Sequence, residues 1–202
     1  LMDMFENLAY DSIYHEHLSY LAVAPLVTFF RQYNMDVFDV QTFKRQGNSI
    51  RVFVGKSGKH PISPNVKEFL DKEKETGLDK FESYQALAAR IEASKNALSA
   101  LLADLKRKKV RIAAYGAPAR GNTLLNYCNI DPETLDFATE ELEPKIGLYT
   151  PGMHIKVKHI EEARKNPPDY YLMLAWDYKD QILKKEFEFV KKGGKFIIPM
   201  PS

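Results

Sequence analysis

Two glycines, an arginine and two small polar residues lie close together in the second half of this 202-residue chain. The spacing Gly116-x-x-x-x-Gly121-Asn122-Thr123 follows that of a phosphate-binding loop, except that asparagine stands where an ATPase carries lysine. Glycines let backbone N–H groups approach an anion, and a helix start adds the positive end of its dipole. Arg120 offers a cation. The stretch predicts anion or nucleotide binding and argues against ATP hydrolysis, with an ordinary tight turn as the alternative.

A second polar cluster, Tyr14-His15-Glu16-His17, lies near the start of the chain. Histidine titrates near neutral pH, and a neighbouring carboxylate can raise its basicity, so the cluster favours acid/base chemistry. Tyr14 is a donor suited to a developing oxyanion. Two alternatives stay open. The imidazoles can serve a structural loop, or His15 and His17 can bind a metal, although Glu16 points the wrong way for a third ligand in an extended chain.

The composition is that of a globular protein, with 45% hydrophobic and 28% charged residues. The net charge of +2 gives no argument for a nucleic-acid partner, and no apolar run is long enough to span a membrane. The lone Cys128 and the absence of a visible signal peptide suit a reducing cytoplasm. A single cysteine also excludes a cysteine-based zinc site here, and we expect no metal centre in this chain.

The first part of the chain predicts a helix over residues 25–33, followed by strands over 36–43 and 50–54. The turn Gln46-Gly47-Asn48-Ser49 joins these strands as an antiparallel hairpin. A helix followed by a C-terminal hairpin also closes the sheet of class I S-adenosylmethionine (SAM) methyltransferases. This pattern alone is an association with a fold. We expect the chain to be a fragment of a longer protein.

Residues 57–202 predict one Rossmann-like α/β domain. After a linker, Ser63-Pro64 starts a short helix that Gly77 ends. A long helix over about 79–108 carries an apolar stripe, which fits packing across its own domain better than a dimeric coiled coil because Lys95 interrupts the seam. The predicted sheet, over about 110–202, is mostly parallel and right-handed within three layers. Its strands are 110–115, 135–139, 155–157, 169–176 and 195–199, and its helices start at Asn122, 159 and 178.

A glycine- and proline-punctuated loop over residues 143–154 connects the second and third of these strands. We expect Lys145 and His154 on this loop to lie at the carboxyl edge of the sheet, where open α/β sheets bind ligands. There they could close over the same ligand as the 116–123 stretch. For His154, a plain surface position is the alternative.

Taken together, these stretches resemble the SAM-dependent sugar C-methyltransferases over nearly the whole chain. The most specific stretch is Tyr115-Gly-Ala-Pro-Ala-Arg-Gly-Asn-Thr-Leu-Leu-Asn126. The others are Tyr14-His-Glu-His17, Gly47-x-Ser49-x-Arg51, Pro151-Gly-x-His-Ile155, Leu174-Ala-Trp176 and Gly193-Gly-Lys-Phe-Ile197. The sequence departs from the family where Arg120 replaces a usual lysine and where Gln46-Gly-Asn-Ser49 replaces His-Gly-Gly-Ser.

The resemblance implies that residues 1–56 are the end of the SAM-dependent methyltransferase domain and that residues 57–202 are the C-terminal domain. It also implies methyl transfer to a carbon of a nucleotide-linked ketosugar through an enolate. It implies His17 as the base, with Tyr14 and Glu16 beside it. From the glycine-bounded helix start and its place at the sheet edge, we predict a substrate-binding set of Tyr115, Gly116, Arg120, Gly121, Asn122, Thr123, Lys145 and His154. The family's zinc module and glycine-rich SAM loop are missing, and no Gly-x-Gly occurs in the sequence. We thus expect zinc and SAM to be bound by missing N-terminal domains of the same enzyme; the alternative is a non-catalytic nucleotide or nucleotide-sugar binding module.

Overall fold

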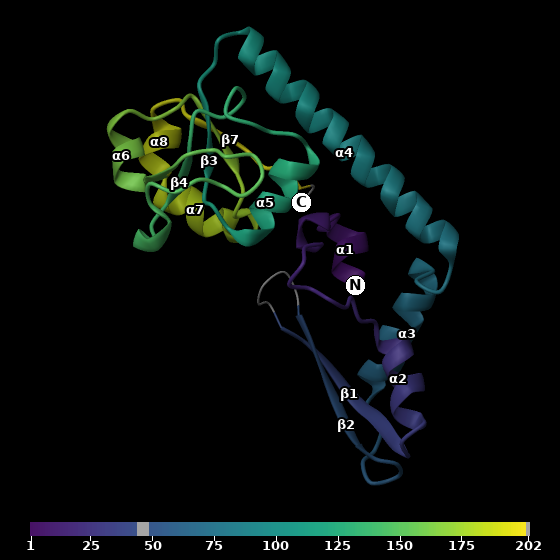
Figure 1. The fold of residues 1–202 in the computed structure, drawn as a ribbon. Coiled ribbons are helices and arrows are strands. Elements are labelled where there is room, and N and C mark those ends of the chain that lie inside the picture. Colours follow the sequence, from purple (N-terminus) through teal and green to yellow (C-terminus); the bar gives the residue numbers. More distant parts are fainter. Residues whose placement is uncertain (44–48, 201–202) are drawn as a thin grey trace. The chain divides into compact units, whose positions relative to one another are not determined.

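The structure is a computed structural model that describes residues 1–43 and 49–200 (Figure 1). The chain forms two compact units. The first holds residues 1–9 and 17–90, and the second holds residues 10–16 and 91–202. The boundary between the units thus falls inside the long helix α4, Phe81–Arg107. The boundary at residues 56 and 57, which rests on the family resemblance, stays a prediction.

The first unit is built on the predicted helix and hairpin. Helix α2 spans Val23–Arg31, and strands β1 (Met35–Phe43) and β2 (Ser49–Lys56) pair antiparallel. Of the predicted turn, Gln46, Gly47 and Asn48 lie outside the described residues, whereas Ser49 begins β2. The short helix α1 spans Met2–Asn7. The core of this unit is a small cluster of valines from α2, β1 and α3: Val23, Val37, Val40 and Val66.

Helix α3 (Pro64–Thr76) begins and ends where its caps predict. The Ser63 hydroxyl accepts from the Asn65 amide at 3.2 Å, and Gly77 closes the helix in the left-handed region at φ 71°. Its Glu73 is buried, and the two carboxylate oxygens accept from the amides of Val23 and Ala24 at 2.6 and 2.8 Å. Glu73 therefore caps α2, whose own N-cap residue makes no side-chain bond.

The second unit contains the predicted parallel sheet with its helices. Its five strands are all parallel, in the order β5-β4-β3-β6-β7. Their bounds are Ile112–Tyr115 (β3), Ala138–Glu140 (β4), Val157–His159 (β5), Tyr170–Met173 (β6) and Lys195–Ile197 (β7). The helices are α5 (Ala119–Tyr127), α6 (Ile160–Lys165), α7 (Lys179–Lys185) and α8 (Phe187–Lys191). Single 3₁₀ turns are η1 (Tyr10–Ser12), η2 (Glu143–Lys145) and η3 (Trp176–Tyr178).

Helices cover both faces of this sheet (Figure 1). Alternate strand residues such as Ala113, Tyr115 and Tyr171 pack with α6 and α7. On the other face α5 approaches so closely that a Cβ on Gly121 would lie 2.9 Å from the Leu174 Cβ. The three-layer Rossmann-like architecture predicted from the sequence is confirmed.

Three local predictions need correction. Helix α5 begins at Ala119 rather than at Asn122, because Pro118 already sets the N-cap and Gly121 fits inside the helix against Leu174. Strand β6 ends at Met173, so Trp176 lies on η3 instead of ending a strand. The predicted helix over 178–192 is two helices, interrupted where Glu186 turns its carboxylate into the core.

Candidate functional site

The strand order places a crossover point at the middle of the sheet. Strand β3 is followed by β4 on one side, whereas β6 pairs with its other side. In open parallel sheets, ligands bind outside the carboxyl ends of the strands at such a point. A cavity of about 270 Å³ lies there, and we call it the carboxyl-edge cavity. It is lined by Tyr115, Gly116, Thr139, Glu140, Glu141, Ile160, Ala175, Tyr178, Gln181, Ile182 and Lys185.

Gly116 brings main chain directly to this cavity. Its φ of 85° lies in the region that favours glycine, and a Cβ there would lie 3.3 Å from the Ala175 Cβ. Its amide donates to the Thr139 hydroxyl at 3.2 Å, and that hydroxyl donates to the Ala114 carbonyl at 3.3 Å. The turn after β3 is thereby fixed to the end of β4, and its glycine leaves room for a ligand to approach the backbone.

Arg120, the predicted cation, is bound to two carboxylates of its own unit. Its guanidinium donates to Asp11 at 2.7 Å and also to Asp177, and it lies over the Trp176 ring at 5.1 Å. Asp11 is 1% exposed and also accepts from the Trp176 indole N–H at 2.7 Å. The arginine therefore joins η1, α5 and η3, and its charge is already matched by acidic groups.

The other predicted residues of this stretch lie in the first turns of α5. Gly121 is buried against Leu174, and Asn122 and Thr123 are half-buried. The Asn122 Oδ1 atom is buried and finds no donor within residues 1–43 and 49–200. Gly121, Asn122 and Thr123 do not line the carboxyl-edge cavity, which receives only Tyr115 and Gly116 from the predicted set.

Lys145 lies against the turn that follows β3. Its ammonium donates to the Ala117 carbonyl and to the Glu140 carboxylate, both at 3.0 Å. Burial alone would raise the pKa of Glu140, but the Glu141 amide and the Lys145 ammonium outweigh it and hold this pKa below its usual value. Glu140 thus presents a stable negative charge at the cavity wall.

His154 does not line this cavity. It is exposed, with a left-handed φ of 55°, at the end of the loop that begins at Pro151. That loop is fastened to α5, because the Asn126 amide donates to the Pro151 carbonyl at 3.0 Å.

The predicted catalytic cluster falls on the boundary between the two units. Tyr14 and Glu16 belong to the second unit, and His17 belongs to the first, so the structure does not bring the three together as one described site. Tyr14 is half-buried, and Glu16 and His17 are exposed. The Tyr14 ring meets His15 edge-on at 6.1 Å. Within residues 1–43 and 49–200, no group of three or more His, Cys, Asp or Glu side chains is arranged to hold a metal ion.

With this geometry in place, comparison with known proteins identifies the family. Residues 44–201 match the model of the C-methyltransferase C-terminal domain. The chain belongs to this family. It is also 34% identical over 203 residues to the C-methyltransferase NovU of Streptomyces niveus. The match covers 100% of this chain and 48% of the relative, so the chain spans about half the length of the curated relative it matches.

A buried polar network of this family member escaped the sequence analysis. The Tyr115 hydroxyl donates to Glu186 at 2.9 Å, and the Arg164 guanidinium also binds this carboxylate. Glu186 is 5% exposed, and burial followed by the Glu186 contact raises the pKa of Tyr115, which stays a donor. The one signal in the sequence is the position of Glu186 among apolar helix residues, which places its carboxylate on the inward face.

None of the helices in the described part of the chain is both long enough and apolar enough to cross a membrane.

Proposed function

We propose that this chain is the C-terminal part of a SAM-dependent C-methyltransferase that acts on a nucleotide-linked ketosugar. Family membership supports the methyltransferase assignment. The observation that carries the substrate assignment is the carboxyl-edge cavity, which lies at the crossover point of a Rossmann-like sheet beside a glycine with positive φ. Sites of this kind take nucleotides in other α/β proteins.

The proposed binding role belongs to the turn after β3 and the start of α5. Backbone N–H groups at this helix start form the positive end of the helix dipole and suit a pyrophosphate. Lys145, held at this turn, is the nearest predicted cation, and His154 is proposed to contribute from its neighbouring loop. Arg120 is proposed to act here too; since it is bound to Asp11 and Asp177, any contact with phosphate adds to an existing ion pair.

The proposed chemistry begins with proton removal from the carbon next to the sugar ketone. The neighbouring carbonyl acidifies this C–H bond, so a base with a pKa near neutrality suffices. We assign that base to His17, with Glu16 to orient it and Tyr14 to donate to the enolate oxygen. SAM supplies an electrophilic methyl group when bound. The sequence holds no Gly-x-Gly, so this chain lacks the glycine-rich loop that binds SAM. We therefore assign no SAM contact to its residues.

The test of the base is His17→Ala in the full-length enzyme, with a nucleotide-linked ketosugar and SAM. Loss of general-base catalysis typically costs a factor of about 10² to 10⁴ in kcat. His15→Ala is the matched control, because it removes a neighbouring exposed imidazole. Near-normal methyl transfer by the His17 variant would refute the assignment.

The substrate site is tested by calorimetry with a nucleoside diphosphate. We expect Lys145→Ala and Arg120→Ala each to weaken binding by about ten- to a hundredfold, the usual loss for a charge-assisted contact. Each titration is paired with a denaturation curve, since both side chains also hold protein groups together. Arg107→Ala, an exposed residue at the end of α4, is the control. Unchanged affinity in a folded variant removes that residue from the site.

A second candidate function is nucleotide or nucleotide-sugar binding without methyl transfer. It is favoured by one observation, namely that the carboxyl-edge cavity is formed by the second unit alone. The two candidates separate in one experiment, because a non-catalytic module would bind the nucleoside diphosphate as the parent does and would transfer no methyl group.

A further inference from the structure

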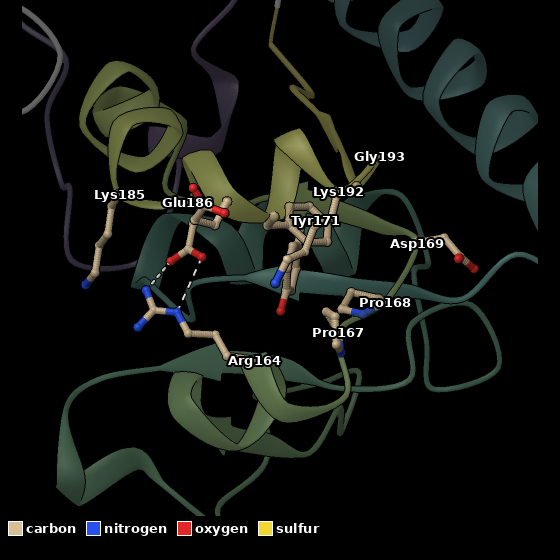
Figure 2. A pocket seen from close by; sticks show the side chains of 12 residues that line it. Arg164, Pro167, Pro168, Asp169, Tyr171, Lys185, Glu186, Lys192 and Gly193 are labelled. Atoms are coloured by element: carbon tan, nitrogen blue, oxygen red, sulfur yellow. Dashed lines mark hydrogen bonds and ion pairs between the residues drawn. The ribbon is translucent and has the colours of Figure 1, made fainter.

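A second cavity opens at the opposite edge of the same sheet (Figure 2). Its volume is about 450 Å³, and we call it the amino-edge cavity. Two of its walls are the loops that lead into β6 and β7, and a third is the junction of α7 and α8. The lining residues are Arg164, Pro167, Pro168, Asp169, Tyr171, Lys185, Glu186, Glu188, Phe189, Lys192, Gly193 and Gly194.

The wall of this cavity contains a tyrosine hydroxyl that forms no hydrogen bond with the described residues. Tyr171 is 2% exposed, and its ring packs on those of Tyr115, Phe189 and Phe196 at 5.0–5.6 Å. Its hydroxyl makes no hydrogen bond with any residue in 1–43 or 49–200. Because Tyr171 lines the cavity, an acceptor held there can take a hydrogen bond from this hydroxyl. Burial raises the pKa of Tyr171 to about 12, which keeps it protonated as a donor.

The basic side chains around this hydroxyl differ in whether a carboxylate of the protein already neutralises them. Arg164 is bound by Glu186 and Glu161, and Lys185 by Glu141. Lys192 has no ion-pair partner in the described part of the chain. Figure 2 shows Lys192 directed toward the same space as Tyr171. Two unmatched donors, one of them cationic, thus face one cavity.

Three acidic residues of the lining bear on the charge of the ligand, and one of them, Glu186, is bound to Arg164. Asp169 is directed away from Tyr171 in Figure 2, and one of its oxygens accepts from the Arg111 amide at 2.8 Å. Glu188 is exposed on α8, so water screens its charge. The apolar walls are Pro167, Pro168 and the Phe189 ring, which suit a flat body.

We propose that the amino-edge cavity binds a small organic anion, a carboxylate or phosphate ester on a flat apolar body, with Tyr171 and Lys192 donating to its oxygens. This site is distinct from the proposed nucleotide-sugar site at the carboxyl edge. The two cavities share Lys185, and Tyr115 and Glu186 connect their walls.

The experiment is calorimetry of the 202-residue chain with benzoate and phenyl phosphate, and with benzamide as the uncharged counterpart. We expect saturable binding of the two anions at millimolar concentrations and weaker binding of benzamide. Tyr171→Phe and Lys192→Gln should each weaken anion binding by about tenfold. Glu188→Gln should strengthen it, because a like charge is removed. Lys191→Gln, which changes the adjacent exposed lysine outside the lining, should leave it unchanged.

Each outcome decides the proposal independently of the nucleotide-sugar site. If neither benzoate nor phenyl phosphate binds saturably, water alone fills the cavity, and the proposal is overturned. Binding that Arg120→Ala abolishes while Tyr171→Phe leaves intact belongs to the carboxyl edge and overturns it as well. Tyr171→Phe keeps the ring, so the variant is expected to fold, and its denaturation midpoint without ligand should not fall.

Discussion

The polar groups beside the two cavities of the parallel sheet differ in how many of them have a protein partner. At the carboxyl edge, Arg120 is neutralised by Asp11 and Asp177, and Lys145 by Glu140. At the amino edge, the Tyr171 hydroxyl and the Lys192 ammonium lack such partners in the described residues. The difference separates charged groups that stabilise the protein from those available to a ligand. A cation next to a cavity is therefore not by itself evidence that it binds an anion.

The largest effect should come from removing the buried partner of Arg120. Asp11→Ala leaves an arginine whose side chain is only 18% exposed without its main counter-ion. Breaking a buried pair in this way costs about 3 kcal/mol or more, measured as the free energy of unfolding in guanidinium. Asp177→Ala, whose carboxylate is more exposed, should cost about 1 kcal/mol. Equal losses would show that burial does not distinguish the two aspartates.

The close approach of α5 to the sheet should give the next largest effect. Alanine normally stabilises a helix over glycine by about 0.5–1 kcal/mol. At Gly121 the added Cβ would lie 2.9 and 3.1 Å from Leu174 carbons, and we expect Gly121→Ala to lower the free energy of unfolding by about 1–2 kcal/mol. Ala119→Gly, at an exposed position of the same helix, reports helix propensity alone. A stabilised Gly121 variant would contradict the close packing.

Two neighbouring tyrosines provide the most direct test of the comparison. Their rings meet at 5.4 Å, and within residues 1–43 and 49–200 the Tyr115 hydroxyl has a protein acceptor whereas the Tyr171 hydroxyl has none. Tyr115→Phe should therefore cost about 1–2 kcal/mol of unfolding free energy, whereas Tyr171→Phe should cost almost nothing. Urea denaturation of both variants measures this. A similar loss in the two would indicate that the Tyr171 hydroxyl is paired after all.

The smallest expected effect concerns acid stability at the carboxyl edge. The pKa of Glu140 is below its ordinary value of 4.5 in the folded chain, so its charge stabilises the fold above about pH 4.5 and this contribution is lost as the pH falls through the folded pKa. Glu140→Gln should lower the free energy of unfolding at neutral pH by under about 1 kcal/mol. The gap to the parent should close in acid. Glu92→Gln, an exposed change on α4, is the control, and a gap that is constant with pH would contradict the explanation.

Local signals in the sequence determined most of the elements. Ser63-Pro64 and Gly77 fix the ends of α3, because capping and left-handed conformations depend on adjacent residues. Strand and helix periodicity likewise predicted the hairpin and the succession of β3 to β7, and with it the parallel sheet. The glycine of the 116–121 turn was found for the same reason, since only glycine readily adopts a φ of 85°.

Tertiary structure alone decided what the buried charges do. The sequence pattern singles out neither Glu73 nor Glu186, yet Glu73 caps a helix 50 residues away and Glu186 accepts from a tyrosine 71 residues away. Arg120 read as a free cation, and its buried partner is 109 residues distant. Period and spacing report which face of an element is apolar. They carry no information on which distant group will meet a charge, because that depends on how the chain folds back on itself.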